Sequence, residues 1–377
     1  ISWALLWSNA HAIFRHWSWN GIPGCTASWE YSCFSSTTKK LYKTNLGIIM
    51  EKQSVFITGG AGYVGAMLVP RLLKEGHRVT VLGLMIYGED VLPKNSALTL
   101  IKGDIRNQEL LKSSIPGHDV VIHLACISND PSFELNPELG KSINLDPFRP
   151  MVEISKNAGV KRFFYASSSS VYGIKDEPNV HEDMPLEPLT DYSVFKMNCE
   201  EILSEYQSDE FTTTTIRPAT VCGYSPRQRL DVVVNILTNL AYHKREISVF
   251  GGAQLRPNIH IADMVEIYVV LLNAPKEKIA GEIFNGGYEN YSVLQLAEAV
   301  RDVIGEDVVL KTTPTDDNRS YHVSSKKIAD VLGFTASHTI KDAVSDIKNA
   351  FEKGFLPNSL DDEMYFNIKR MQSINLK

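Results

Sequence analysis

The architecture follows from one stretch, Ser54-Val-Phe-Ile-Thr-Gly59-Gly-Ala-Gly62-Tyr-Val-Gly65. Its apolar start predicts a buried strand, its glycines predict a tight turn, and the apolar spacing that follows predicts a helix. In such a unit Gly59 permits the turn, Gly62 lets backbone N–H groups approach a pyrophosphate, and Gly65 lets the helix pack on the strand. A glycine-rich surface turn is the alternative. The flanking strand and helix patterns favour a dinucleotide-binding turn, with the phosphates at the helix N-terminus.

Strand and helix patterns alternate from Met50 onward. The expected strands are Ser54–Thr58, Arg78–Leu82, Leu98–Lys102, Val120–Leu124, Arg162–Ser167 and Thr213–Arg217. The expected helices include residues 63–75, which Pro70 should kink, and residues 138–158, 191–206, 293–304 and 338–353. Such alternation predicts an α/β protein with a Rossmann-type, doubly wound parallel sheet. We expect a Rossmann domain over residues 50–219 and a smaller α/β substrate lobe over 220–377, with the chain crossing back to the first domain.

Tyr192 and Lys196 are spaced four residues apart in a predicted helix, so they lie on the same helix face. A free tyrosine titrates near pH ~10, and a neighbouring ammonium can favour its phenolate. The pair alone also fits a solvated helix face. A strand pattern that ends in Ser167-Ser-Ser-Ser170 precedes it by about 25 residues, and ligands bind beyond the carboxyl ends of parallel strands. A serine there can hydrogen-bond a substrate hydroxyl, which completes a Ser–Tyr–Lys constellation of Ser168, Tyr192 and Lys196.

From about Met50 to the C-terminus, the chain resembles an extended short-chain dehydrogenase/reductase of the nucleotide-sugar epimerase/dehydratase family. The resemblance rests on the glycine turn, the Ser–Tyr–Lys set and further motifs in the same order. These motifs are Gly103-Asp104-Ile105-Arg106, His123-Leu124-Ala125-Cys126, Asn144, Arg217-Pro-Ala-Thr220-Val-Cys-Gly223, Arg256-Pro-Asn-Ile-His260-Ile-Ala-Asp263 and Asp317-Asn-Arg319.

The resemblance implies a role for each matching residue. Tyr192 is the expected catalytic base, Lys196 its charged neighbour and Ser168 the group that orients the substrate hydroxyl. The expected NAD-binding residues are Gly59, Gly62, Tyr63, Val64, Gly65, Asp104, Ile105, Leu124, Ala125, Asn144, Tyr192 and Lys196. The expected substrate-binding residues are Ser169, Thr220, Arg227, Arg256 and Arg319, with Arg229 as a further candidate for the diphosphate. No metal is expected, and a homodimer is the default in this family.

The implied reaction is hydride transfer at a carbinol carbon of a nucleotide-diphosphate sugar, with C4 expected. Family 4,6-dehydratases carry an acidic pair where this chain has Ser169 and Ser170, so we do not expect elimination. Family 3,5-epimerase/reductases carry a cysteine where Ser170 stands, so that chemistry is disfavoured as well. Epimerisation and plain dehydrogenation both remain open. The alternatives are a carbonyl reductase acting on a small non-nucleotide substrate and a non-catalytic NAD-binding regulator.

Two positions depart from the family pattern. Gly83 stands where an acid usually binds the adenine-ribose hydroxyls. No arginine follows closely to receive a 2′-phosphate, so NAD stays the expected cofactor. Thr220 replaces a sugar-site asparagine, which indicates a sugar that differs from galactose.

Composition excludes several other classes. The chain has 377 residues, 44% hydrophobic and 22% charged, with a net charge of −6. That balance predicts neither a nucleic-acid-binding face nor a polybasic membrane patch. The five scattered cysteines fit a reducing compartment, and we expect a cytoplasmic protein. Residues 1–49 differ because they hold all five tryptophans and are basic. We expect them to be an extension outside the fold, from an over-long reading frame, with a targeting segment or an aromatic arm as alternatives.

Overall fold

The computed structural model describes residues 41–43, 49–128, 132–133, 135–315, 320 and 322–377. Two predictions therefore fall wholly or mostly outside the described residues, namely the nature of the extension over 1–49 and the role of Arg319. Strands β1 (Leu41–Lys43) and β2 (Ile49–Glu51) pair antiparallel just before the first long strand.

The central element is a seven-stranded sheet in the order β12-β8-β7-β6-β3-β4-β5, and every neighbouring pair is parallel. Its strands are β3 (Ser54–Thr58), β4 (Arg78–Gly83), β5 (Leu98–Lys102), β6 (Val120–His123), β7 (Arg162–Ala166), β8 (Thr212–Pro218) and β12 (Glu282–Gly286). The six predicted strands and the doubly wound parallel sheet are thus confirmed. The strand order reverses between β3 and β6, and such a switch point opens a crevice for ligands at the carboxyl ends of the strands.

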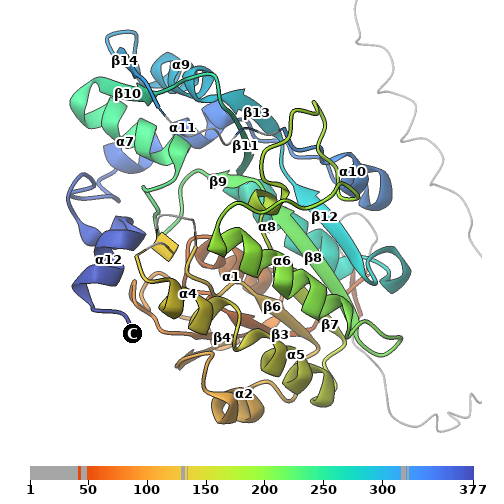
Figure 1. Cartoon of the computed structure of the whole chain (residues 1–377). Helices are drawn as coiled ribbons and strands as arrows, with labels where there is room; N and C mark the ends of the chain where they lie inside the picture. Colours follow the sequence, from red (N-terminus) through yellow and green to blue (C-terminus); the bar gives the residue numbers. More distant parts are fainter. Residues whose placement is uncertain (1–40, 44–48, 129–131, 134, 316–319, 321) are drawn as a thin grey trace, which may run out of the picture. The chain divides into compact units, whose positions relative to one another are not determined.

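Helices cover both faces of this sheet (Figure 1). Alternate residues of β3 point to opposite faces. Val55 and Ile57 pack with α1 (Gly65–Lys74) and α8 (Ile261–Asn273), whereas Phe56 packs in the core on the other face. The helices of that second face are α2 (Gln108–Ser114), α4 (Pro137–Asn144), α5 (Phe148–Asn157) and α6 (Asp191–Ser204). Burial on both faces explains why the strands read as continuous apolar runs.

One predicted helix is wrong, because residues 138–158 form two helices. Helix α4 ends at Asn144 and α5 begins at Phe148, with Pro147 as its N-cap residue. Proline cannot donate a backbone hydrogen bond, and it disfavours the helical conformation of the residue before it. The apolar periodicity continues through the break, which made the segment resemble a single helix. Pro70, by contrast, lies inside α1, which continues to Lys74.

From Thr220 onward the chain forms smaller sheets beyond the carboxyl ends of the main sheet, and we call this group of elements the second lobe (Figure 1). Strands β9 (Thr220–Cys222), β11 (Leu255–His260) and β13 (Glu289–Ser292) form one small sheet, and β10 (Glu246–Phe250) pairs with β14 (Val309–Thr313). A separate core packs α7 (Val233–Lys244), α9 (Val293–Ile304) and α11 (Ile340–Glu352) together. Between these elements, α8 and β12 return to the first lobe.

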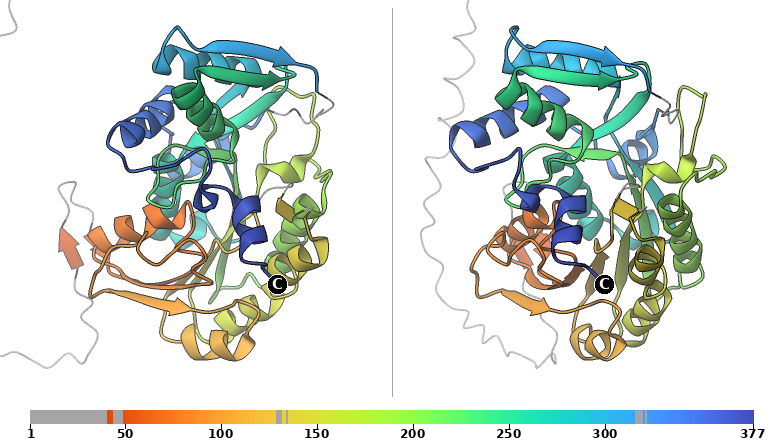
Figure 2. Two further views of the ribbon diagram at one scale, coloured as in Figure 1. Left: turned by 90° about the vertical axis from the view of Figure 1, so that its left-hand side faces the viewer. Right: turned by 60° about the vertical axis from the view of Figure 1, so that its left-hand side comes forward.

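Short elements complete the chain. They are the 3₁₀ turns η1 (Ser169–Tyr172), η2 (Lys276–Lys278) and η3 (Glu363–Tyr365), and the helices α10 (Lys326–Leu332) and α12 (Asn367–Ser373). Helix α12 lies beside the segment that follows β4, where Arg370 Nε donates to the carbonyl of Ile86 (Figure 2). Among the helices that the structure describes, none has both the length and the apolar character needed to span a membrane.

Candidate active site

A cavity of about 480 Å³ lies at the carboxyl ends of the sheet strands, where the reversed strand order predicts a ligand. Its wall combines the glycine turn, the ends of β4, β6 and β7, the start of α6, strand β9 and helix α12. The charged side chains among the described lining residues are Asp104, Lys196, Arg227, Arg229 and Arg256. Cations therefore outnumber acids around this cavity, which suits ligands with phosphate groups.

The glycine turn leaves no room for side chains. Gly59 has a φ of +73°, and a Cβ there would lie 2.7 Å from the backbone of Ala125. A Cβ on Gly65 would lie 2.4 Å from the carbonyl oxygen of Gly60, where α1 begins against the turn. The partial positive charge at the N-terminus of a helix attracts phosphate groups. This bare backbone cradle at a helix N-terminus fits the pyrophosphate of a dinucleotide.

Tyr63 and Val64 also line the cavity, as predicted for cofactor contacts. The Tyr63 hydroxyl donates to the Gly223 carbonyl at 2.6 Å and accepts from Asn235 Nδ2 at 2.9 Å. Burial and then the nearby Cys222 raise the pKa of Tyr63, so this phenol stays neutral. Its side chain therefore ties the glycine turn to the second lobe.

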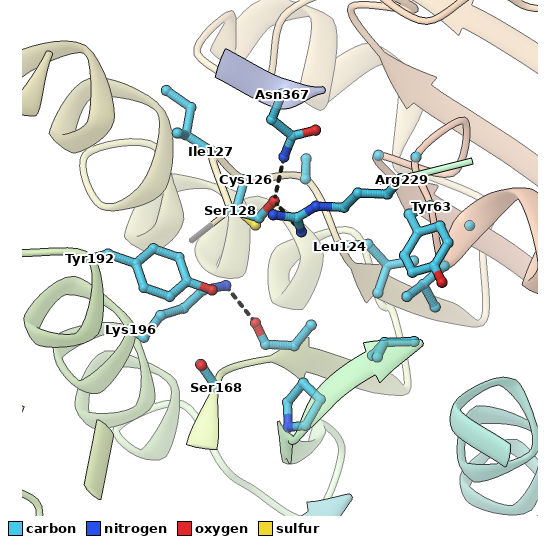
Figure 3. A pocket seen from close by; sticks show the side chains of 18 of the residues that line it. Tyr63, Leu124, Cys126, Ile127, Ser128, Ser168, Tyr192, Lys196, Arg229 and Asn367 are labelled. Carbon is cyan, nitrogen blue, oxygen red and sulfur yellow. Dashed lines mark hydrogen bonds between the residues drawn. The ribbon is translucent and has the colours of Figure 1, made fainter. Parts of the chain in front are cut away.

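Helix α6 presents Tyr192 and Lys196 to the same cavity (Figure 3). The helix begins with a capping box between Thr190 and Ser193, which fixes its first turn just before the tyrosine. Lys196 Nζ donates to the carbonyl of Ala166 at 2.6 Å and lies 5.8 Å from the centroid of the Tyr192 ring. Its carbonyl partner ends β7, so the lysine joins α6 to the strand that leads into the serine cluster.

Ser168 lies at the start of η1, directly after β7, and also lines the cavity. Its Oγ accepts hydrogen bonds from the backbone N–H of Ser170 at 3.1 Å and from the Ser170 hydroxyl at 2.8 Å. The Ser168 proton is thereby directed away from Ser170. Ser169 is buried beside it and is a lining residue as well. The fold thus brings Ser168, Tyr192 and Lys196 together in one cavity.

A buried ion pair holds α6 against the sheet. Arg217 on β8 donates from Nε and Nη2 to both carboxylate oxygens of Glu200, which lies one turn after Lys196. The Glu200 carboxylate also accepts from the Ser167 hydroxyl. Because both ions are almost fully buried, removing either would leave an uncompensated charge. The pair positions the helix that carries Tyr192.

The polar run His181-Glu182-Asp183 predicts a solvated loop, and the position of Glu182 shows that this prediction is wrong. Glu182 is buried, and its Oε1 accepts from the backbone N–H of Asn285 at 2.7 Å. Its backbone carbonyl accepts from Arg217 Nη1. Only the flanking residues, His181 and Asp183, are exposed. The distant partner explains why the sequence pattern alone was misleading.

Four further residues predicted to bind NAD line the cavity, namely Asp104 and Ile105 of the expected adenine-side motif, and Leu124 and Ala125 after β6. Asp104 is held by Arg106, whose Nε and Nη2 donate to the Asp104 carboxylate. Asn144 is not among the lining residues. Its carboxamide bonds the backbone N–H and carbonyl of Ile127 at 2.8 and 2.9 Å, so it shapes the wall from behind.

Of the predicted substrate-binding residues, Thr220 and Arg256 line the cavity from the second lobe, and Ser169 lines it from η1. Arg227 also lines the cavity, but it lies beside the segment that follows β4. Its guanidinium stacks at 3.6 Å from the ring centroid of Tyr87, in the segment that follows β4.

Sequence reasoning missed part of the cavity wall. Tyr87, Asn367, Met371 and Leu376 line the cavity, and three of these come from the last stretch of the chain. No motif marks them, because α12 is only seven residues long and lies far in sequence from the glycine turn. Among the described residues, no group of three or more His, Cys, Asp or Glu side chains could hold a metal ion.

Comparison with known proteins agrees with this geometry. The family model of the NAD dependent epimerase/dehydratase family matches residues 55–287. A UDP-glucose 4-epimerase of Lactobacillus helveticus is 27% identical over 315 residues, which cover 77% of this chain and 94% of that protein. The structure of MoeE5 in complex with UDP-glucuronic acid and NAD is 27% identical with a TM-score of 0.70, and the match covers 80% of this chain and 99% of that one.

A dTDP-glucose 4,6-dehydratase of Streptomyces venezuelae, DesIV, solved with NAD and TYD bound, shares the fold. It is 21% identical with a TM-score of 0.74, and the match covers 82% of this chain and 100% of that one. The family model spans most of the sheet, the glycine turn and the Ser168, Tyr192 and Lys196 positions. The chain belongs to the NAD-dependent epimerase/dehydratase family, of the extended short-chain dehydrogenase/reductase type.

Proposed function

We propose that this protein is an NAD-dependent epimerase or dehydrogenase that oxidises a carbinol carbon, C4 by preference, of a nucleotide-diphosphate sugar. The observation that carries the proposal is the shared cavity of Ser168, Tyr192 and Lys196, between the glycine turn and the cations of the second lobe. UDP-glucose 4-epimerases among the relatives support the sugar-nucleotide class.

The chain's own residues supply proton transfer and orientation. Tyr192 takes the proton of the sugar hydroxyl as a general base. The Lys196 ammonium stabilises the phenolate form of Tyr192 that accepts this proton, and its bond to Ala166 keeps it in place. Ser168 Oγ accepts from Ser170, so its own proton is free to orient the sugar oxygen. NAD bound in this cavity would supply the hydride-transfer chemistry at the sugar carbon.

The wall has serines, Ser169 and Ser170, at the two positions where family 4,6-dehydratases carry acidic residues. Ser170 bonds Ser168, and Ser169 is buried next to it. Among the described lining residues, Asp104 is the one carboxylic acid, and Arg106 binds it on the adenine side. A serine hydroxyl is too weak an acid to protonate a leaving group. These residues support epimerisation or oxidation over elimination.

A diphosphate-bearing substrate is favoured over a small carbonyl compound. Arg256 lies on β11 and lines the cavity beside Thr220 of the neighbouring strand β9. A guanidinium suits phosphate because its planar N–H groups match the phosphate oxygens. A small non-nucleotide substrate has no phosphate group for this cation to bind.

That the protein forms a homodimer stays a prediction.

The decisive experiment incubates purified protein with UDP-glucose, UDP-glucuronic acid, UDP-N-acetylglucosamine and dTDP-glucose, and identifies the products by chromatography and mass spectrometry. An epimer without net formation of NADH indicates an epimerase, whereas stoichiometric NADH indicates a dehydrogenase. Loss of water from the sugar would contradict the expectation of epimerisation or oxidation over elimination. Turnover of a simple ketone without any sugar nucleotide would favour the carbonyl reductase.

A further inference from the structure

Two arginines, the buried Arg227 and the partly buried Arg229, lie on the cofactor side of the cavity, away from the expected sugar. The sheet order places β4 and β6 on either side of the glycine strand β3, while Ser168 follows β7, one strand further out. Arg227 stacks on Tyr87, which follows β4. Arg229 Nη1 donates at 3.0 Å to Ser128, which follows β6. The pair therefore spans the crevice above the glycine turn.

The Arg227 guanidinium group is buried, and it does not use all of its hydrogen-bond donors among the described residues. It is 4% exposed, and its Nη2 donates to Asn367 Oδ1 at 2.6 Å. Within the described part of the chain, its Nε has no hydrogen-bond partner. Burial lowers the pKa of Arg227, and the neighbouring charge of Arg229 acts in the same direction. A buried guanidinium in this state is stabilised by an anion.

Arg229 is only partly neutralised. Its Nε donates to Asp231 at 2.6 Å, and its Nη1 reaches Ser128. One Nη nitrogen, Nη2, has no hydrogen-bond partner among the described residues. The Asp231 carboxylate acts electrostatically on both guanidinium groups. The pair keeps an excess positive charge and unused N–H donors inside a cavity that receives a dinucleotide.

Asn367 of α12 and Arg229 both donate to the Ser128 hydroxyl oxygen (Figure 3). Its Oδ1 accepts from Arg227 and from the Tyr87 hydroxyl, and its Nδ2 donates to Ser128 Oγ at 3.1 Å. Its backbone N–H donates to Asp231 at 2.7 Å. The side chain and backbone of this single asparagine therefore bind groups on three other segments of the cavity wall.

Further contacts hold α12 over the cavity. Arg370 donates to the Ile86 carbonyl at 2.7 Å, and Met371 and Leu376 line the cavity next to it. Met371 packs in the same apolar cluster as Ile105, which lies on the predicted adenine side. The end of the chain thus covers the adenosine half of the crevice.

We propose that Arg227 and Arg229 bind the pyrophosphate of NAD from the side opposite the glycine turn, and that α12 acts through Asn367 as a clasp that positions them. The assignment moves Arg227 from the substrate to the cofactor. It rests on the family's use of NAD and is independent of which sugar is converted. Because the clasp covers the cofactor, NAD leaves slowly while the clasp is closed.

Ligand binding tests the assignment without any turnover. Calorimetry compares NAD, ADP-ribose, adenosine and UDP on the purified protein after its bound nucleotide has been removed. Loss of a charge-assisted phosphate contact in Arg229→Met or Arg227→Met should weaken NAD and ADP-ribose about 10- to 100-fold. Adenosine lacks the pyrophosphate, so its weak binding should not change. UDP binding should also be unchanged.

The clasp is tested by the dissociation rate of NAD. Asn367→Ala should accelerate release about 10-fold or more, because it removes several of the contacts that position the arginines. Gln372→Ala is the matched control, since Gln372 is exposed on the same helix. Arg245→Met controls for loss of a cation, because Arg245 pairs with Asp307 at an exposed site. Both controls should retain the wild-type rate.

Two results would overturn the proposal. The first is a loss of UDP affinity in the arginine variants while NAD and ADP-ribose bind normally, which would return both residues to the substrate. The second is unchanged NAD binding in Arg229→Lys and Arg229→Met alike. If Arg229→Met fails to fold by circular dichroism, Arg227→Met decides the matter, because both arginines are assigned to the same pyrophosphate. If the protein converts no sugar nucleotide but the arginine variants still lose affinity for NAD, only the proposed function is refuted.

Discussion

The Lys196 ammonium lies 5.8 Å from the centroid of the Tyr192 ring, while the same Nζ donates to the Ala166 carbonyl at 2.6 Å. The carbonyl fixes the ammonium between the strand end and the helix. A positive charge held at this distance stabilises a phenolate more than a neutral phenol. The spacing of the two residues along α6 and the end of β7 together produce this arrangement.

Lys196→Met should lower turnover about 100-fold or more, because the phenol loses the charge that favours its ionised form. The residual rate should rise with pH toward the range in which a free tyrosine ionises. The pH–rate profiles of the wild type and the variant provide the measurement. A variant with the wild-type profile would mean that the ammonium does not act on Tyr192.

Arg217→Met should destabilise the fold by about 3–5 kcal/mol, because it leaves the buried Glu200 carboxylate without its cation. Urea unfolding followed by circular dichroism measures this change. The double variant Arg217→Met/Glu200→Leu should recover much of the loss, since no buried charge remains. Equal stability of the wild type and Arg217→Met would show that this ion pair does not hold α6.

His123 should make the fold sensitive to acid. Burial, followed by the charge of Lys196, lowers the pKa of His123 from 6.5 to about 3, and its Nδ1 lies 2.6 Å from Thr58 Oγ1. Below pH 6.5 the His123 imidazole therefore binds a proton in the unfolded chain, whereas in the folded chain it stays neutral until the pH is near 3. Between these values this residue should cost about 1.4 kcal/mol of stability per pH unit.

His123→Asn should flatten the fall in unfolding free energy between pH 6.5 and pH 5, when urea unfolding is repeated across that range. His181→Gln is the control, because His181 is exposed. An unchanged pH slope in His123→Asn would mean that other groups govern the acid sensitivity.

Gly83→Asp should tighten NAD binding about 10-fold, because a carboxylate at this strand end can accept hydrogen bonds from the adenine-ribose hydroxyls. The structure has space for it, since an added Cβ would meet its nearest neighbours at 3.9 Å or more. Titration calorimetry with NAD measures the change, and Gly83→Ala controls for the added bulk. Unchanged affinity in Gly83→Asp would show that the ribose does not lie at this position.

The sequence was most informative where the chemistry is local. The turn from Ser54 to Gly65 and the pair Tyr192–Lys196 each lie within one or two consecutive elements, so spacing and residue type predict them. The strands of the main sheet were predictable for the same reason, since burial on both faces gives continuous apolar runs. Pro147 indicates a break between two helices, but the apolar residues on both sides of it keep the spacing of a single helix, so the sequence pattern favoured one helix.

Other parts of the cavity depend on contacts between distant segments. Tyr87 and Asn367 are hydrogen-bonded across 280 positions of sequence, and Glu182 and Asn285 across 103. Neither α12 nor Glu182 carries a pattern that predicts its burial. Arg227 was identified as a phosphate-binding candidate by its chemistry, but which end of the crevice it occupies depends on the stacking with Tyr87.

The most direct test of the catalytic account is the Tyr192→Phe variant, assayed for sugar-nucleotide conversion and titrated with NAD in parallel. Removal of the phenolic oxygen alone should reduce turnover by about 10²- to 10⁴-fold while the affinity for NAD stays close to that of the wild type. Turnover that survives this change would contradict the assignment of Tyr192 as the base.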